Sequence, residues 1–330
     1  MPASRLQLAA ESGAIDLPEG TFGWLNANSG STLGIDDHRL HATQSFFPDH
    51  ARLEARGISV SPFLQRQVDH AVIQAHRSKA ASFNLIAQTL EHTSPGALIS
   101  VDGDKTDGIE SILKELKRRF DGVESYSKAH GKLVWFKHPD VMPDISDWID
   151  VTYLYPNGWV TRAGVFSADG PDQGSKALAS ALPVLTGKVA DLGAGWGYLS
   201  GEALKSETIT ELHGFEADFH ATECAKHNVR DARARFHWSD VLSLEENGFD
   251  VVISNPPFHT TRKPDTTLGS AFIHKAADML KPKGALWMVA NRNLPYEATL
   301  ASRFRRVDVI SESGGFKVIS ARTPKTSRTG

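Results

Sequence analysis

Residues 251–258 combine an apolar run with a motif that could hold a planar amine against an electrophile. They read Val251-Val252-Ile253-Ser254-Asn255-Pro256-Pro257-Phe258. The two prolines stiffen the backbone and remove N–H donors, which leaves carbonyl oxygens free to accept hydrogen bonds. Asn255 adds a side-chain carbonyl as a second acceptor, and Phe258 adds a flat face on which a base can stack. These residue types predict a binding site for an N–H₂ group.

About 60 residues upstream lies a glycine-rich segment that could bind a nucleoside. It reads Asp191-Leu192-Gly193-Ala194-Gly195-Trp196-Gly197 and is followed by a helical pattern. Glycines at this spacing let the backbone turn tightly and approach a ligand, with a helix N-terminus behind them. The next strand-like stretch ends at Glu216, where a carboxylate can accept hydrogen bonds from both hydroxyls of a ribose. A third stretch leads to Asp240, which could accept from an adenine amine.

The spacing of the glycines differs from that of the dinucleotide-binding fingerprint. Counting from Gly193, the last glycine of Gly-x-Gly-x-x-Gly would fall at Tyr198, so that fingerprint is not satisfied, whereas Gly-x-Gly-x-Gly is. Four strand ends thus carry, in order, a glycine loop, an acid, a second acid and Asn-Pro-Pro-Phe. This order matches a parallel sheet whose ligands lie at the carboxyl ends of its strands.

These motifs together resemble class I S-adenosylmethionine (SAM)-dependent methyltransferases that act on exocyclic amines. Three further segments make the chain similar to the bacterial rRNA guanine-N2 methyltransferases, the group of the small-subunit enzyme RsmC and the large-subunit enzyme RlmG. They are Gly164-Val165-Phe166-Ser167 with Gly170, Asp172, Gly174 and Ser175, then Val289-Ala290-Asn291 with Leu294-Pro295-Tyr296, and finally Gly315-Phe316-Lys317-Val318. The resemblance covers residues 155–323 well and the first half of the chain only faintly.

The resemblance implies a cofactor, a substrate and a role for each motif residue. SAM would be the cofactor, and the substrate would be a guanine N2 amine in ribosomal RNA or the small ribosomal subunit, with 16S rRNA preferred. The residues expected to bind SAM are Phe166, Ser175, Asp191, Gly193, Ala194, Gly195, Gly197, Glu216, Asp240 and Asn255. The residues expected to act on the amine are Asn255 and Pro256 as acceptors, Pro257 in the turn and Phe258 as a stacking face. Trp196 could close over SAM or pack against the next helix.

Other interpretations of the same motifs stay open. Asn-Pro-Pro-aromatic sites also methylate adenine in nucleic acids and the glutamine amide of release factors, although the aromatic residue there is often Tyr or Trp. A SAM-binding ribosome-assembly factor without catalysis is a third candidate, which the intact glycine loop disfavours. A NAD-dependent dehydrogenase would leave residues 255–258 without an explanation.

Composition and charge restrict the class of protein. No stretch approaches the roughly 20 apolar residues of a membrane span, and the N-terminus shows no signal-peptide pattern, so we expect a cytoplasmic protein. The single cysteine, Cys224, and the scattered histidines predict no metal site. The net charge is −3, but residues 1–150 carry −5 and residues 301–330 carry +5, including Arg305 and Arg306. Such a basic segment suits contacts with RNA phosphates.

The first half of the chain carries a faded copy of the second. Residues 22–28 parallel residues 189–195 at an offset of 167, and later segments follow in the same order at offsets of 172 to 188. A kept order with slowly drifting offsets is typical of a duplicated unit. In the copy, the glycines become Asn26-Ala27-Asn28, the ribose acid becomes Gln44, and Asn-Pro-Pro-Phe becomes Ala75-His76-Arg77-Ser78.

We therefore expect two domains with different roles. Residues 1–145 would form a degenerate methyltransferase-like domain that binds no SAM and instead supports the fold or faces RNA. Residues 146–330 would form the catalytic domain. Two fused copies amount to an intramolecular pseudo-dimer, so we expect the chain to act as a monomer.

Strands must end at the motif residues in order to position them. Apolar stretches predict strands near 187–192, 210–216, 234–238, 249–254 and 284–290, with a helix over Ser175–Leu185 before them and helices between them. Hairpins are expected over 152–161 and 304–321. Strands that alternate with helices predict a parallel, doubly wound sheet with an antiparallel edge. The expected fold class is α/β, with two tandem Rossmann-like class I methyltransferase domains, the N-terminal one degenerate.

Overall fold

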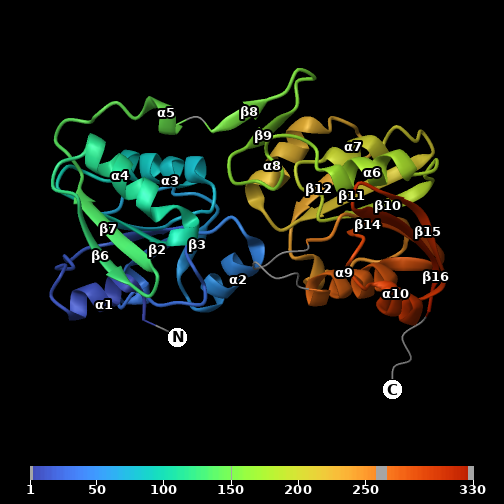
Figure 1. Ribbon diagram of the computed structural model, residues 1–330, viewed down its shortest axis with the longest axis horizontal. Coiled ribbons are helices and arrows are strands. Elements are labelled where there is room, and N and C mark those ends of the chain that lie inside the picture. Colours follow the sequence, from blue (N-terminus) through green and yellow to red (C-terminus); the bar gives the residue numbers. More distant parts are fainter. Residues whose placement is uncertain (1–2, 150, 258–265, 326–330) are drawn as a thin grey trace. The chain divides into compact units, whose positions relative to one another are not determined.

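The computed structural model describes residues 3–149, 151–257 and 266–325. The chain divides into two compact units, Met1–Thr152 (unit 1) and Tyr153–Gly330 (unit 2). Each unit is built on a seven-stranded sheet with helices on its faces (Figure 1). In the described parts of the chain, no helix is both long enough and apolar enough to cross a membrane.

Unit 1 alternates strands with helices. Its strands are β1 (Phe22–Leu25), β2 (Leu40–Thr43), β3 (Ser59–Ser61), β4 (His70–Gln74), β5 (Leu98–Asp104), β6 (Glu124–Lys128) and β7 (Gly131–Lys137). Its helices are α1 (Arg5–Glu11), α2 (Phe47–Ala55), α3 (Lys79–Glu91), α4 (Ile109–Arg119) and α5 (Ser146–Ile149), with short 3₁₀ helices η1 (Asp37–Arg39) and η2 (Lys105–Asp107).

The sheet of unit 1 has the strand order β3-β2-β1-β4-β5-β7-β6. Its first five strands run parallel, and β7 pairs antiparallel with both β5 and β6. Helices α1 and α2 cover one face, where Leu6 and Leu53 pack with Trp24. Helices α3 and α4 cover the other face through Ile86 and Ile112. All four residues of β1 are buried, as a central parallel strand covered on both faces requires.

Unit 2 repeats this alternation. Its strands are β8 (Thr152–Leu154), β9 (Val160–Arg162), β10 (Gly187–Leu192), β11 (Ile209–Glu216), β12 (Ala234–Trp238), β13 (Phe249–Ser254), β14 (Leu280–Asn291), β15 (Phe304–Ser313) and β16 (Phe316–Pro324). Its helices are α6 (Gln173–Ala181), α7 (Tyr198–Ala203), α8 (Phe219–Asn228), α9 (Thr266–Met279) and α10 (Glu297–Arg303), with the 3₁₀ helix η3 (Val241–Ser243). Strands β8 and β9 form a separate two-stranded sheet.

The large sheet of unit 2 has the order β12-β11-β10-β13-β14-β16-β15, with five parallel strands and an antiparallel edge. Alternate side chains of β10 enter two different cores, because successive residues of a strand point to opposite faces. Leu192 packs with Phe272 of α9 and Leu300 of α10, whereas Val189 packs with Leu178 of α6 and residues of α7. Figure 1 shows α9 and α10 on one face of this sheet and α6 and α7 on the other.

The two large sheets share one strand order, which confirms the α/β tandem fold. The register of the strands agrees as well. Trp24 lies level with Ala42, and Asp191 lies level with Gly214, so matching Leu25 to Leu192 also matches Gln44 to Glu216. Gln44 therefore occupies in unit 1 the position that Glu216, the acid expected to bind the ribose, occupies in unit 2.

One position of the expected correspondence is wrong by a single residue. Leu25 is level with Ile73, whereas Leu192 is level with Ser254. Gln74 therefore stands where Asn255 stands in unit 2, one residue before the expected Ala75. The matching valines of the two strands suggested the wrong register, because apolar strand residues are interchangeable and the hydrogen-bonded register is not.

The predicted elements of unit 2 agree with the observed ones except at some ends. All five predicted strands of its parallel sheet and both hairpins are present. The helix expected over Ser175–Leu185 instead spans Gln173–Ala181. Its C-cap, Leu182, is extended and precedes Pro183, and a residue before proline disfavours the helical conformation.

Candidate active site

The predicted site residues of unit 2 follow neighbouring strands of one sheet. Strand β10 lies between β11 and β13 and runs parallel to both. Gly193 comes directly after β10, Glu216 is the last residue of β11, and Asn255 comes directly after β13. Because parallel strands end at the same edge of a sheet, these segments meet there.

The loop that follows β10 requires glycine for its backbone. Gly193, Gly195 and Gly197 have φ angles of +75°, +55° and +92°, a region that residues with side chains rarely adopt. The loop is tied to the neighbouring strand, because the N–H groups of Gly193 and Ala194 both donate to the carbonyl oxygen of Phe215, over 2.9 and 3.1 Å. Strand β11 thus fixes where the loop begins.

We expect Gly197→Ala to lower the free energy of unfolding more than Gly195→Ala does. Alanine at a positive φ costs about 1–2 kcal/mol at either position. A Cβ on Gly195 would have open space around it, whereas one on Gly197 would lie 3.0 Å from Val229 Cγ2 and 3.2 Å from Ala225 Cα. Forcing α8 to shift should add about 1–3 kcal/mol. Urea unfolding measures both losses, and equal losses would show that α8 does not confine the loop.

Glu216 uses both carboxylate oxygens to hold the backbone around it. The N–H of Gly195 donates to Oε2 over 2.7 Å, and the N–H of Asp218 donates to Oε1 over 2.8 Å. Each oxygen keeps a further lone pair, so the carboxylate can still accept from a diol. Burial raises the pKa of Glu216 to about 7, although the two backbone hydrogen bonds act in the opposite direction. Donors on a ligand would favour the ionised form.

Asp191 is a buried carboxylate at the start of the same loop. Its side chain is fully buried, and Ser200 Oγ of α7 donates to Oδ2 over 2.7 Å. The other oxygen, Oδ1, is buried without a hydrogen-bond partner. Burial, together with the charge of Glu216, raises the pKa of Asp191 to about 7, although the hydrogen bond from Ser200 acts in the opposite direction. Asp191 thus ties α7 to β10 and keeps one oxygen for a donor.

The side-chain amide of Asn255 is held at its nitrogen and has no partner at its oxygen. Nδ2 donates to Asp172 Oδ2 and to Ser175 Oγ, in both cases over 2.9 Å. Oδ1 is buried and accepts no hydrogen bond. Pro256, the next residue, is buried, and Pro257 is exposed. Because an unsatisfied buried oxygen costs free energy, Oδ1 marks a position where a ligand N–H would bind.

A small pocket joins the glycine loop to Asn255. Six of the predicted site residues line it, namely Phe166, Ser175, Gly193, Ala194, Gly195 and Asn255. Phe166 is 68% exposed, an unusual position for a phenylalanine, and its ring is available to a ligand. The structure therefore brings the glycine loop and Asn255 to one cavity.

The other four residues of the predicted cofactor set, Asp191, Gly197, Glu216 and Asp240, do not line this pocket. Glu216 reaches it through the N–H of Gly195. Asp240 follows β12, whose Trp238 lies level with Glu216, and its Oδ1 accepts from the N–H of Leu242. Asp240 thus stands at the same edge of the sheet, one strand further from Asn255 than Glu216 is.

Trp196 packs mainly against α8, the second helix after it, and it also lines the pocket. Its side chain is only 4% exposed and belongs to an apolar cluster with Ala221 and Cys224 of α8. Tyr155 stacks on it with ring centroids 6.1 Å apart, and Trp159 meets it edge-on at 5.7 Å. The indole therefore links the glycine loop to α8 and to the segment between β8 and β9.

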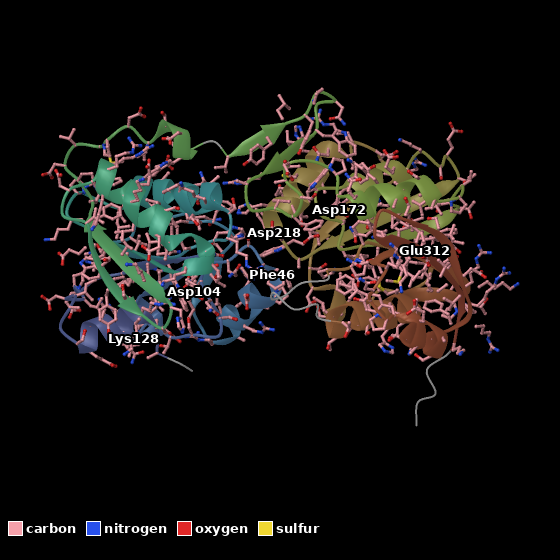
Figure 2. All side chains as sticks on the ribbon, in the orientation of Figure 1. Phe46, Asp104, Lys128, Asp172, Asp218 and Glu312 are labelled. Atoms are coloured by element: carbon pink, nitrogen blue, oxygen red, sulfur yellow. The ribbon has the colours of Figure 1, made fainter. Side chains whose placement is uncertain are left out.

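Asp172 has a role in the site that its sequence motif did not reveal. It caps α6, because the N–H of Ser175 donates to Oδ2 over 2.9 Å, and the same oxygen accepts from Asn255. Figure 2 labels Asp172 at this position. An aspartate three residues before Ser175 is a recognisable N-cap signal. The contact with Asn255, which is 83 positions away, follows only from the fold.

Two predictions concern other parts of the site. Phe258, together with His259, lies outside the described residues, so its stacking role stays a prediction. Within the described ranges, no group of three or more His, Cys, Asp or Glu side chains could hold a metal ion.

In unit 1, amide side chains stand at the corresponding positions and bond to the backbone. Gln44 is buried, donates through Nε2 to the carbonyl oxygen of Ala27 over 2.7 Å, and accepts at Oε1 from the N–H of Phe46 over 2.8 Å. Asn26, at φ +52°, donates through Nδ2 to the carbonyl oxygen of Gln74 over 3.0 Å. The neutral amide of Gln44 thus bonds within the protein, where the carboxylate of Glu216 would hold a diol.

The chain is similar to known proteins over its second half and, for some relatives, over most of its length. Residues 157–320 match the family described as methyltransferase small domain. The ribosomal RNA small subunit methyltransferase C of Shewanella loihica is 31% identical over 301 residues, which cover 88% of this chain and 87% of the relative. The protein of the same description from Shewanella oneidensis is 34% identical over 245 residues, 72% of this chain and 71% of the relative.

A solved structure has the same fold over nearly the whole chain. It is described as the T. thermophilus 16S rRNA N2 G1207 methyltransferase (RsmC) in complex with AdoMet and guanosine. The match has a TM-score of 0.80 at 22% sequence identity and covers 94% of this chain and 90% of that one. Because one chain aligns across both units of the other, the tandem arrangement is common to both proteins.

Proposed function

The chain belongs to the family of ribosomal RNA small subunit methyltransferases C, and we propose that it methylates the exocyclic N2 amine of a guanine in small-subunit rRNA, with SAM as the methyl donor. The observation that supports this most directly is the unpartnered oxygen of Asn255 in a pocket that also contains the glycine loop. That oxygen could accept a hydrogen bond from an amine, and it lies beside a glycine loop suited to a nucleoside cofactor.

The residues of the pocket fit SAM. A side chain on Gly195 would project into open space, so its absence leaves room for a ligand against the backbone. Glu216 would accept from the ribose hydroxyls, and Asp240 would accept from the adenine amine. Asp191 would serve the amino-acid end of the cofactor through its unpartnered Oδ1. Bound SAM supplies a methyl group on a sulfonium, which is transferred by in-line displacement.

The amine-binding residues would align the nucleophile. The lone pair of the guanine amine is delocalised into the ring and points poorly at an electrophile. We propose that Asn255 Oδ1 and the carbonyl oxygen of Pro256 accept the two N–H bonds, which orients the nitrogen and favours its sp³ character. Closing water out of the pocket strengthens these hydrogen bonds. The methylated amine then loses one proton to solvent, so no strong general base is required.

The substrate must present its base outside the RNA stack. An amine in a duplex cannot reach a pocket of this kind, so the guanine would be flipped out or taken from a single strand. The C-terminal segment 301–330 has a net charge of +5 and would contact RNA phosphates. Arg306 is level with Arg322, Ala285 and Val251, at the start of β13, so these contacts would lie away from Asn255, which follows the end of that strand. We further propose that the chain acts as a monomer on the rRNA of the small ribosomal subunit in the cytoplasm.

Transfer of a labelled methyl group distinguishes the candidate substrates. The protein is incubated with labelled SAM and, separately, with unmethylated small-subunit rRNA, large-subunit rRNA, assembled small subunits and a release factor. The proposal expects label in small-subunit rRNA, free or assembled. Label confined to large-subunit rRNA or to the release factor would refute the substrate, and SAM binding with no transfer to any of them would favour a non-catalytic factor.

We expect a stoichiometry of one SAM per chain. We propose that unit 1 is a degenerate domain without catalysis, because the neutral Gln44 stands there in place of the carboxylate of Glu216. Isothermal titration calorimetry of the full chain measures the stoichiometry directly. Glu216→Ala should weaken SAM binding strongly, whereas the matched change Gln44→Ala in unit 1 should leave the affinity of the site unchanged. Two equivalents of SAM per chain would contradict the assignment of unit 1.

A further inference from the structure

We propose that Asp172 is a positioning residue that fixes the orientation of the Asn255 amide, an inference that rests on the proposed function of that amide. Asp172 would act through Asn255 and would not touch the substrate. Its carboxylate would hold Nδ2 and so present Oδ1 to the target amine. Three features of unit 2 support this role.

First, only Asp172 can distinguish the two ends of the amide. The Nδ2 group of Asn255 donates to Asp172 Oδ2 and to Ser175 Oγ. A hydroxyl can donate or accept, so Ser175 alone would tolerate either the nitrogen or the oxygen of the amide. A carboxylate accepts only, and it would repel the amide oxygen. The rotation that leaves Oδ1 unpartnered is therefore the one that Asp172 selects.

Second, the carboxylate of Asp172 is itself held in place. Its Oδ2 accepts from the N–H of Ser175, which makes Asp172 the N-cap of α6. That helix is anchored in the core through Leu178, which is fully buried. Gly174 provides the space, because a Cβ there would lie 2.9 Å from Asp172 Oδ2. A carboxylate fixed by a helix end can hold its partner in a defined geometry.

Third, the charge of Asp172 strengthens the acceptor that Asn255 presents. A carboxylate beside Nδ2 makes a charge-assisted hydrogen bond and polarises the amide, so that Oδ1 carries more negative charge. The amine nitrogen gains positive charge as it takes up the methyl group. A more negative Oδ1 stabilises that charge in the transition state more than in the ground state. Asp172 should therefore affect kcat rather than the affinity for SAM.

The test is a double-mutant cycle with two substitutions at Asp172. Asp172→Ser keeps a helix-capping oxygen but is too short to reach Asn255, and Asp172→Asn keeps an accepting carbonyl without the charge. We expect Asp172→Ser to lower kcat by about 10- to 100-fold with the SAM dissociation constant within about twofold, and Asp172→Asn to recover part of that loss. In an Asn255→Ala background, Asp172→Ser should cause no further loss. A full additional loss would show that Asp172 acts independently of Asn255 and would overturn the proposal.

A measurement without substrate separates this inference from the function on which it rests. The side-chain amide protons of Asn255, assigned by their absence in Asn255→Ala, are followed by NMR of the full chain. We expect their exchange with solvent to be slow in the wild type and at least about tenfold faster in Asp172→Ser, because a hydrogen bond to a carboxylate is lost. Unchanged exchange would overturn the role of Asp172. Faster exchange in a protein that methylates no rRNA would refute the proposed function and leave the positioning role intact.

Discussion

Asn255→Ala is expected to lower kcat for rRNA methylation by about 10²- to 10³-fold, because the substitution removes the acceptor that aligns the amine. The wild-type amide is already held by two hydrogen bonds at Nδ2, and its oxygen is buried without a partner. The pocket is thus arranged before any ligand binds, and alanine would delete the arranged group without adding bulk. Single-turnover kinetics with saturating SAM and rRNA measure the loss in the chemical step.

The matched control for this variant is Asn247→Ala, an identical change at an exposed residue of the loop before β13. Surface substitutions of this kind change stability by about 0.5 kcal/mol or less, so activity should be retained. The affinity of Asn255→Ala for SAM, measured by calorimetry, should stay within a few-fold of the wild type. A variant that binds SAM normally and methylates at more than a third of the wild-type rate would contradict the role of Asn255.

SAM binding is expected to release a proton at pH values below about 7. Burial raises the pKa values of Glu216 and Asp191 to about 7, so both carboxyls are largely protonated in the ligand-free protein at pH 6. Ribose hydroxyls that donate to Glu216, and the positive charges of SAM, favour the ionised carboxylates. The dissociation constant of SAM should therefore rise, for each pH unit below 7, by up to about tenfold for each carboxyl that ionises on binding. Calorimetry at pH 6 in buffers of different ionisation enthalpy counts the released protons.

Glu216→Gln provides the control, since a neutral amide of the same shape cannot titrate. In this variant SAM should bind more weakly, and the proton release should fall to what Asp191 alone contributes. Wild-type protein that binds SAM equally well at pH 6 and pH 8, without proton release, would contradict the assignment of Glu216 to the cofactor site.

The same pKa values determine how the ligand-free protein responds to pH. A carboxyl whose pKa is raised on folding holds a proton that the unfolded chain has already released. The contribution of Glu216 and Asp191 to the free energy of unfolding is therefore greatest near pH 4 and declines as pH rises to about 7. Bound SAM should offset that decline, because it stabilises the ionised forms.

The order of strands and helices could be predicted from the sequence because each central strand is a short apolar run that ends at a recognisable residue. Leu192 and Ser254, for instance, precede a glycine and an asparagine, and both are buried on a central strand. Strand register was harder to predict. The shared valines of β4 and β13 suggested Ala75 as the counterpart of Asn255, whereas the ladder places Gln74 there. Hydrogen bonds between neighbouring strands set the register, and the apolar residues of a strand do not reveal which register forms.

The site could be predicted where the type of a residue and its place after a strand indicate its role. Glycines at positive φ, an acid at the end of β11 and an asparagine after β13 all carry local signals. Asp172 does not, since its sequence context indicates only a helix N-cap. Its second partner, Asn255, is brought to it by the packing of α6 on the sheet, where Leu178 lies in one core with Ile253 of β13. The packing of Trp196 could not be read from the sequence either, because Tyr155 and Trp159 come from a hairpin about 40 residues earlier.

The central claim, methylation of a guanine N2 amine in small-subunit rRNA, is tested most directly by identifying the methylated nucleoside. Unmethylated small-subunit rRNA is incubated with the protein and with SAM that carries a trideuterated methyl group, then digested to nucleosides and analysed by mass spectrometry. The account predicts trideuterated N2-methylguanosine at no more than one residue per rRNA molecule. Deuterium in N6-methyladenosine, or in any nucleoside other than N2-methylguanosine, would contradict it.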